Sequence, residues 1–271
     1  MSKGFRVTVS PIPAWLDWQR LLGVGDWNAS ELENGKLELT ATLDRGEAAD
    51  LAARLRKVGI GGEILQVEIL PKPNRKELRR AATDEARRLR ERSVGFGRKG
   101  VQLDDEGRMS LTPEALALAL GERANGQRVI DSCAGAGGNA IGFARAGCSV
   151  LAIELDPQRL AMAKHNAGIY GIADRIKFEC GDAREILPEC EADLLFIDPP
   201  WGGDYDKTNV SLSDLQPAEE LIALAAHIPK KWLKVPPSFD PASLPGCRVE
   251  AVFGVGRGDE HRVKFLLVEV G

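Results

Sequence analysis

The sequence predicts an α/β fold in which a Rossmann-like, mostly parallel sheet ends in an antiparallel hairpin and a smaller α/β domain precedes it. From about residue 128, short apolar runs alternate with helical stretches, which is typical of a parallel sheet covered by helices on both faces. The last two apolar runs, RVEAVFGVG and HRVKFLLVEVG, are joined directly by RGDE and indicate an antiparallel pair. A glycine-rich stretch follows the first strand of the series, as in nucleotide-binding folds.

Composition limits the class of protein. The chain has 271 residues, of which 44% are hydrophobic and 28% are charged, and no run of apolar residues is long enough to cross a membrane. The opening MSKGFRVTVSPIP lacks the apolar core of a secretory signal, so a cytoplasmic protein is expected. Five cysteines without a CxxC pair argue against disulfides and a structural zinc site. We expect no metal and no membrane partner.

The first part of the chain, residues 1–72, is expected to form the smaller α/β domain. Its elements are predicted as a strand in FRVTVSP, a helix in AWLDWQRLLG, a strand in KLELTATL, a helix in EAADLAARLRKVG and a strand in ILQVEILP. Pro71 and Pro73 then mark a boundary. One hypothesis gives this domain a role in substrate recognition.

A basic helical segment is expected over residues 73–126, ahead of the core. A helix from 74 to about 93 would place Leu78, Ala82, Ala86 and Leu89 on one stripe. Between Lys72 and Lys99 there are eleven Lys or Arg and four Asp or Glu, a local charge of +7, which leaves −11 on the rest of a chain whose total is −4. Such a stretch attracts a polyanion, although a solvated helix explains the charge equally well.

The core, residues 127–271, is predicted from its strands in order. RVID, SVLAIEL, KFEC and ADLLFID are short runs that are apolar almost throughout, as in strands buried on both faces. A helix in LSDLQPAEELIALAAHI, a strand in KKWLKVP and the terminal antiparallel pair then complete the sheet. This ending differs from that of the dinucleotide-binding strand order and weakens the case for a nicotinamide cofactor.

The glycine-rich stretch SCAGAGGNA contains Gly135, Gly137 and Ala140, which satisfy the pattern G-x-G-x-x-G/A between a strand and a helix. Glycines let the backbone approach a nucleotide, and the amino end of a helix offers free N–H groups. Glu154 follows near the end of the second strand, 19 residues after Gly135, where a carboxylate suits the two hydroxyls of a ribose.

Two further acids end strands at the same sheet edge. Asp131 ends the first strand, and Asp182 ends the third, where it could accept from an adenine amino group. A pyrophosphate would be repelled by Asp131 beside the glycine loop. S-adenosylmethionine carries a sulfonium and an ammonium and no phosphate, so an acidic loop fits it better than a nicotinamide dinucleotide.

The segment DPPWGG follows the fourth strand. Pro199 and Pro200 remove two N–H donors, so that carbonyl groups and the Asp198 carboxylate form an acceptor wall. Asp198 and the Pro199 carbonyl could each accept one N–H of a conjugated amine and turn its lone pair towards a methyl donor. Trp201 offers a face on which a base can stack. Asp198, Pro199 and Trp201 are therefore the catalytic candidates.

These motifs resemble the trimethylguanosine synthase family, class I methyltransferases that act on the guanine amine of RNA caps. The likeness covers DSCAGAGGNAIGFA, VLAIELDPQRLAMAKHNAGIYGIADRIKFECGDA, FIDPPWGG and, upstream, LDDEGRMSLTPEALA, within residues 95–271. This chain departs from the family pattern at one position: the cap enzymes of the family carry serine where this chain has Asp198. Aspartate is usual in the wider amino-methyltransferase pattern, which includes enzymes of ribosomal and transfer RNA, so the RNA remains open.

The resemblance implies S-adenosylmethionine as cofactor and RNA as partner. It implies that Pro199 and Trp201 hold guanine, that Asn166 contacts the base, and that Ser110 and Thr112 face the cofactor or the base. The cofactor-binding candidates are Asp131, Ala134, Gly135, Gly137, Glu154, Leu155, Asp182, Ala183 and Thr112. Two alternatives stay open: the same chemistry on a small molecule or a protein amide, and a non-catalytic RNA-binding module.

Overall fold

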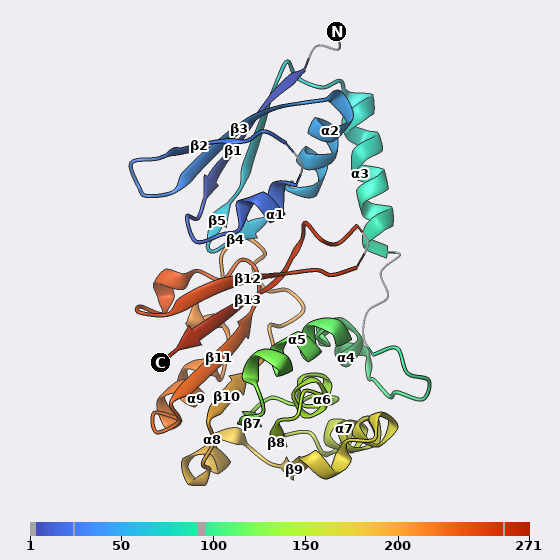
Figure 1. The fold of residues 1–271 in the computed structure, drawn as a ribbon, viewed down its shortest axis with the longest axis vertical. Coiled ribbons are helices and arrows are strands. Elements are labelled where there is room, and N and C mark those ends of the chain that lie inside the picture. The colour runs from blue at the N-terminus through green and yellow to red at the C-terminus, as the bar shows by residue number, and fades with distance from the viewer. Residues whose placement is uncertain (1–3, 24, 91–95, 257) are drawn as a thin grey trace.

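The computed structural model describes residues 4–23, 25–90, 96–256 and 258–271 (Figure 1). Its larger sheet has seven strands in the order β12-β13-β11-β10-β7-β8-β9. Their bounds are β7 (Arg128–Asp131), β8 (Ser149–Glu154), β9 (Ile176–Cys180), β10 (Leu194–Ile197), β11 (Lys230–Val235), β12 (Arg248–Phe253) and β13 (Val263–Val270). β7 to β11 pair in parallel, whereas β13 is antiparallel to both β11 and β12. The mostly parallel sheet with a terminal antiparallel pair is confirmed.

Helices cover both faces of this sheet. They are α4 (Asp105–Ser110), α5 (Glu114–Ala124), α6 (Gly138–Arg145), α7 (Pro157–Tyr170), α8 (Ala183–Ile186) and α9 (Ala218–Leu224). β10 shows why its sequence LLFI is apolar throughout. Phe196 packs in the cluster with α5, α6 and α7, its neighbour Ile197 packs in the cluster with α9, and both are fully buried.

The helix predicted over LSDLQPAEELIALAAHI is shorter than expected. A 3-10 turn occupies Leu212–Asp214, and α9 begins only after Pro217. Pro217 has no N–H to donate into a preceding turn, so a helix begins there more readily than it continues through.

α5 and α6 pack closely because two glycines face each other. A Cβ added to Gly142 would lie 2.4 Å from the carbonyl oxygen of Ala117, and one added to Gly121 would lie 2.5 Å from the carbonyl oxygen of Gly142. Both positions exclude a methyl group unless the backbone moves.

We expect Gly142→Ala to lower the free energy of unfolding by about 1 to 3 kcal/mol, because the new methyl group forces the two helices apart. Gly168→Ala is the matched control. Gly168 is also helical and exposed, and its added Cβ would meet nothing within 4 Å. There the methyl group should raise stability by about 0.4 to 1 kcal/mol. Urea unfolding of both variants checks the pair, and equal effects would contradict the packing argument.

The N-terminal part of the chain forms a second, antiparallel sheet in the order β2-β3-β1-β6. Its strands are β1 (Phe5–Ile12), β2 (Asn28–Glu31), β3 (Leu37–Leu43) and β6 (Gln66–Leu70), with α1 (Trp18–Leu22), α2 (Arg45–Arg54) and a small hairpin of β4 (Gly59–Ile60) and β5 (Glu63–Ile64). Both helices are shorter than predicted. β2 was not predicted, because its sequence NASE carries no apolar alternation and every residue is exposed.

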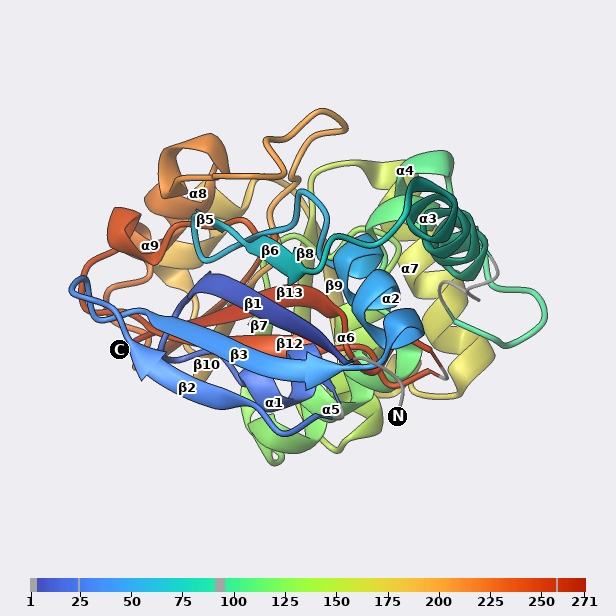
Figure 2. The ribbon, with the colours of Figure 1, turned by 90° about the horizontal axis from the view of Figure 1, so that it is seen from above.

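α3 (Arg75–Arg90) packs along α2, and both views show it on the outside of the molecule (Figures 1 and 2). The predicted apolar stripe is wrong: Leu78 and Ala86 are exposed, Ala82 is half-buried, and the side chain of Leu89 lies outside the described part. Among the described side chains of α3, Ala81 and Glu85 are buried instead. Glu85, the buried acid of this helix, is paired with Arg262.

α1 and α3 both contact the turn between β12 and β13. Glu85 of α3 forms an ion pair with Arg262, which is itself mostly buried. Arg20 of α1 donates to the carbonyl oxygen of Gly254 at 3.1 Å and lies 4.9 Å from the centre of the Phe253 ring. These contacts fix the turn, whose residues line the cavity described next.

None of the helices in the described ranges is long and apolar enough to span a membrane.

Candidate active site

A cavity of about 1490 Å³ lies at the carboxyl edge of the parallel strands. Its wall is formed by the residues that follow β7, β8, β9 and β10, by the end of β11, by residues 109–116 and by the turn after β12. Small-molecule pockets usually measure about 300 to 1,000 Å³. This cavity has room for two ligands side by side, as a group-transfer reaction requires.

The glycine loop and Glu154 form part of the cavity wall. The Gly135 N–H donates to Glu154 Oε2 at 2.7 Å, and the Asp156 N–H donates to Oε1 at 2.9 Å. These two bonds fix the carboxylate, whose oxygens each retain acceptor capacity for a ligand hydroxyl. Gly135 lines the cavity with φ at +53°. Ala134, which is buried, and Leu155, which is 67% exposed, also belong to the wall.

Gly137 shapes the loop without lining the cavity. It begins α6 with φ at +90°, and a Cβ there would lie 3.0 Å from the Cβ of Ala163. A glycine is required at this position because φ is positive and because α7 approaches closely. The sequence predicted a cofactor contact for Gly137, whereas in the structure Gly137 supports the loop from outside the cavity wall.

Asp131 lies beneath the loop and outside the cavity wall. Its side chain is fully buried, and neither oxygen has a hydrogen-bond partner of standard geometry among the described residues. Burial, and then repulsion by Asp198, raise its pKa to about 8, which the nearby N–H groups of Cys133 and Ala140 offset only in part. At neutral pH this carboxyl is therefore mostly protonated in the ligand-free protein.

This pKa predicts a pH-dependent stability. An unfolded aspartate releases its proton near its ordinary pKa of 3.8, whereas folded Asp131 keeps it up to about pH 8. The folded state therefore binds more protons between these values, and its stability falls as pH rises through that window. Asp131→Asn removes this loss. We expect its stability gain over the unmodified chain to be larger at pH 8 than at pH 5 in urea unfolding; a gap independent of pH would contradict the assignment.

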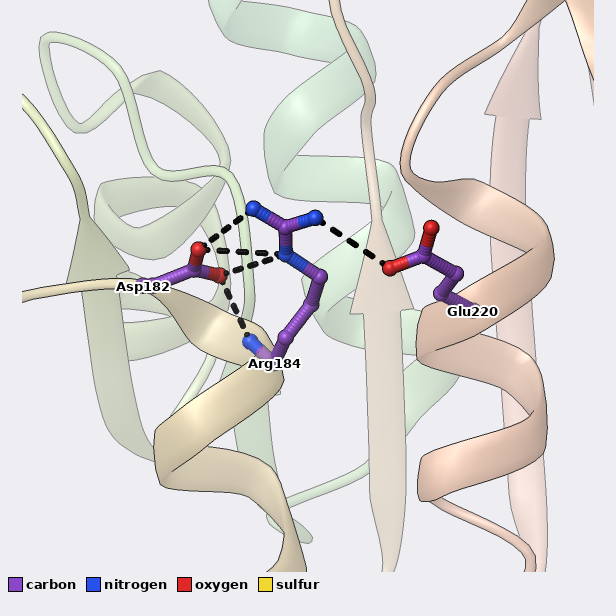
Figure 3. Close-up of polar contacts among 3 residues, drawn as sticks. All are labelled: Asp182, Arg184 and Glu220. Carbon is purple, nitrogen blue, oxygen red and sulfur yellow. Dashed lines mark hydrogen bonds and ion pairs between the residues drawn. The ribbon is translucent and has the colours of Figure 1, made fainter.

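Asp182 lines the cavity and is engaged by Arg184 (Figure 3). It caps α8 by accepting the Arg184 N–H at 2.9 Å, and the Arg184 Nη2 lies 2.6 Å from its Oδ2. Arg184 also reaches Glu220 of α9 through Nη1 at 3.2 Å. The guanidinium holds the pKa of Asp182 below its usual range. A ligand amino group would share this carboxylate with Arg184, beside the buried Ala183.

The segment after β10 brings Asp198, Pro199 and Trp201 to the cavity wall. Asp198 Oδ2 accepts from the side-chain amide of Asn139 at 2.9 Å and from Lys234 Nζ at 2.7 Å. Both bonds go to the same oxygen, so Oδ1 retains acceptor capacity. Trp201 is half-buried, and its indole N–H donates to the carbonyl oxygen of Lys234 at 3.3 Å.

Asn139 and Lys234 were missed by sequence reasoning. Asn139 lies inside the glycine loop, where the pattern leaves that position unspecified. Lys234 has a signal in retrospect: it follows Trp232 and Leu233 and precedes Val235, and all three are buried. A lysine within a continuous buried run needs a hydrogen-bonding or acidic partner, since a lone buried ammonium is very costly.

The family resemblance also implied roles for Ser110, Thr112 and Asn166, and not all three lie at the cavity. Ser110 and Thr112 line the cavity, and the Thr112 hydroxyl is buried without a partner among the described residues. Asn166 does not line it. Its side-chain amide is used by the backbone, since Nδ2 donates to the carbonyl oxygens of Gln102 and Ala136 and Oδ1 accepts from the Gln102 N–H, each at 2.8 to 2.9 Å. Asn166 joins the upstream segment to the glycine loop.

The free donors and acceptors of the cavity fit S-adenosylmethionine. Glu154 presents a fixed carboxylate suited to two ribose hydroxyls. The Thr112 hydroxyl and the Asn139 Oδ1 are buried polar atoms without partners in the described ranges, and a ligand with an amino and a carboxylate group would satisfy both. Within those ranges no group of three or more His, Cys, Asp or Glu side chains is arranged to hold a metal ion.

Comparison with known proteins confirms the resemblance. Residues 126–230 match the family model for RNA cap guanine-N2 methyltransferase. Trimethylguanosine synthase of Schizosaccharomyces pombe is 40% identical over 131 residues, which cover 44% of this chain and 54% of that protein. That of Saccharomyces cerevisiae is 29% identical over 149 residues, covering 51% and 46%. The chain thus spans about half the length of the curated relatives it matches.

The fold is shared with solved structures. One chain from Porphyromonas gingivalis W83, assigned as a methyltransferase, superposes with a TM-score of 0.51 at 18% identity, covering 82% of this chain and 57% of that one. The Rossmann-like methyltransferase fold predicted from the sequence is confirmed.

Proposed function

We propose that this chain is an S-adenosylmethionine-dependent N-methyltransferase that acts on the exocyclic amine of guanine in RNA. One observation carries the proposal: Asp198, Pro199 and Trp201 share a single cavity with the glycine loop and Glu154. The family match over residues 126–230 and the two trimethylguanosine synthases support the same reaction class.

The cofactor end of the cavity is assigned from its fixed acceptors. Glu154 would hold the ribose hydroxyls, Asp182 the adenine amine, and Thr112 with Asn139 the amino-acid end. Leu155 and Ala183 would contact the adenine from their places on the wall. When bound, S-adenosylmethionine supplies an electrophilic methyl group.

Asp198 and Pro199 orient the acceptor nitrogen. The lone pair of a guanine amine is delocalised into the ring, so the amine is a poor nucleophile until it is turned. Asp198 Oδ1 and the Pro199 carbonyl would each accept one of its N–H bonds, and such positioning can lower a barrier by about 7 to 11 kcal/mol. After transfer the nitrogen is cationic, and the Asp198 carboxylate stabilises it and accepts its proton.

Trp201 would hold the plane of the base. Its indole is fixed from one edge by the Lys234 carbonyl, and Tyr205 lies edge-on with ring centres 5.8 Å apart. An indole held in this way loses little entropy when a base stacks on it, and stacking on aromatic side chains contributes about 1 to 3 kcal/mol per base.

α3 would contact the RNA backbone. Arg75, Lys76 and Arg79 are exposed on this helix, which the buried pair of Glu85 and Arg262 connects to the cavity wall. An exposed cationic helix attached to the catalytic domain suits a phosphate backbone that enters the active site.

Removal of these three charges should make RNA binding less dependent on salt. We expect the triple substitution to glutamine to reduce the slope of log K against log salt by about 0.7 to 0.9 for each phosphate that the helix no longer neutralises. Lys177→Gln, which removes one exposed charge from β9, is the control and should leave the slope unchanged. An unchanged slope in the triple variant would exclude α3 from the RNA surface.

Labelled S-adenosylmethionine tests the proposal against its alternatives. The full chain is incubated with total RNA, DNA, protein or free nucleotides, and label is expected in RNA alone. Label in protein or in a small molecule would replace guanine by another planar amine, and no label in any fraction would favour the non-catalytic RNA-binding module.

The cytoplasm is the proposed compartment, which suits the five unpaired cysteines.

A further inference from the structure

Lys234 places a buried ammonium at the point where Asp198 and Trp201 meet. Its side chain is 5% exposed, and its Nζ lies 2.7 Å from Asp198 Oδ2 and 3.2 Å from the Ser110 carbonyl oxygen. The same nitrogen lies 5.2 Å from the centre of the Trp201 ring and 5.6 Å from that of Phe265. The indole on which a base would stack therefore already interacts with a cation.

The ion pair beside the indole carries no net charge. Asp198 is paired with Lys234, and Asp131, whose pKa is about 8, is mostly protonated at neutral pH. The other lysine of the cavity wall, Lys264, is paired with Asp259 at 3.2 Å. An unpaired Asp198 beside a tryptophan would attract a positively charged base. The ammonium of Lys234, paired with Oδ2, offsets that attraction for a charge spread over the base, while Oδ1 still acts on the amine in direct contact with it.

We propose that Lys234 determines substrate specificity: it makes the Trp201 site prefer an uncharged guanine to a cationic, N7-alkylated guanine. This inference rests on the proposed function and narrows its substrate class. A neutral guanine still gains stacking and the two hydrogen bonds of its amine. A cationic guanine meets a fixed positive charge held near the same ring, in an interior where such charges are poorly screened.

Nucleotide binding tests this role without relying on turnover. Affinities of the full chain for GMP and 7-methyl-GMP are measured by calorimetry at slightly acidic pH, where the 7-methylguanine ring keeps its positive charge. We expect the unmodified chain to bind GMP more tightly. Lys234→Met should shift the ratio of the two affinities towards 7-methyl-GMP by about tenfold or more, and Lys234→Arg should preserve the original preference.

Asp198→Asn supplies a change of opposite sign, which keeps the test decisive if Lys234→Met does not fold. Loss of the anion leaves the ammonium uncompensated, so the preference for GMP should increase. Cofactor affinity serves as the folding control for every variant. Tighter binding of 7-methyl-GMP by the unmodified chain, or a ratio that none of the variants changes, would overturn the role of Lys234. If neither nucleotide binds, the guanine site itself fails, and with it the proposed function.

Discussion

Replacement of Asp198 by alanine is expected to reduce methyl transfer by at least about 10²- to 10³-fold while cofactor affinity stays within about twofold of normal. The variant loses the acceptor that orients the amine and the charge that stabilises the cationic nitrogen after transfer, and loss of one such group has effects of this size. Single-turnover transfer to RNA and cofactor titration measure the two quantities. The informative result is a loss of methyl transfer without a loss of cofactor affinity.

Asp193→Ala is the matched control for this variant. Asp193 precedes β10 and Asp198 follows it, so the two carboxylates flank the same strand. Asp193 pairs with Arg128 at 2.9 Å away from the cavity. Its loss should leave transfer unchanged. Normal transfer by Asp198→Ala would remove Asp198 from the mechanism, and equal losses in both variants would show a general effect on β10.

Replacement of Glu154 by alanine is expected to weaken cofactor binding by about 10²-fold or more. The carboxylate would accept two ribose hydroxyls, and hydrogen bonds to a charged group contribute about 1.5 to 3 kcal/mol each. Glu154→Gln keeps one acceptor oxygen and should lose less. Calorimetric titration with S-adenosylmethionine measures both variants.

Glu179→Ala on the neighbouring strand β9 controls for the loss of charge, because Glu179 pairs with the exposed Lys177 and does not line the cavity. Glu154 also accepts two backbone N–H groups of its own loop, so urea unfolding is measured alongside. A Glu154→Ala variant that folds and binds the cofactor normally would contradict the ribose assignment.

The core sheet could be predicted because its strands carry their signal locally. All four residues of β10 are apolar, since helices cover both faces of the sheet, and the glycine loop lies between a strand and a helix as its pattern requires. β2 and the buried side of α3 had no such signal. The burial of Glu85 depends on Arg262, which is 177 residues away, and helical periodicity cannot contain a partner of that kind.

The residues of the candidate site likewise include some that the sequence could predict and some that it could not. Glu154, Asp198 and Trp201 follow or end strands of one sheet, and parallel topology brings such positions to a common edge. Lys234 reaches the site from β11 through a side chain, and no motif marks it. Asn166 lay within a resembling segment, but its amide is used by the backbone of Gln102 and Ala136. Partners of individual atoms are set by packing, which the sequence pattern does not specify.

The central claim is that this cavity transfers a methyl group to the exocyclic nitrogen of guanine, and mass spectrometry of nucleosides tests it most directly. RNA is incubated with the full chain and S-adenosylmethionine, digested to nucleosides and compared with RNA treated with Asp198→Ala. We predict a guanosine methylated at N2 in the first sample and its absence from the second. A methyl group on another atom or another base would contradict the claim.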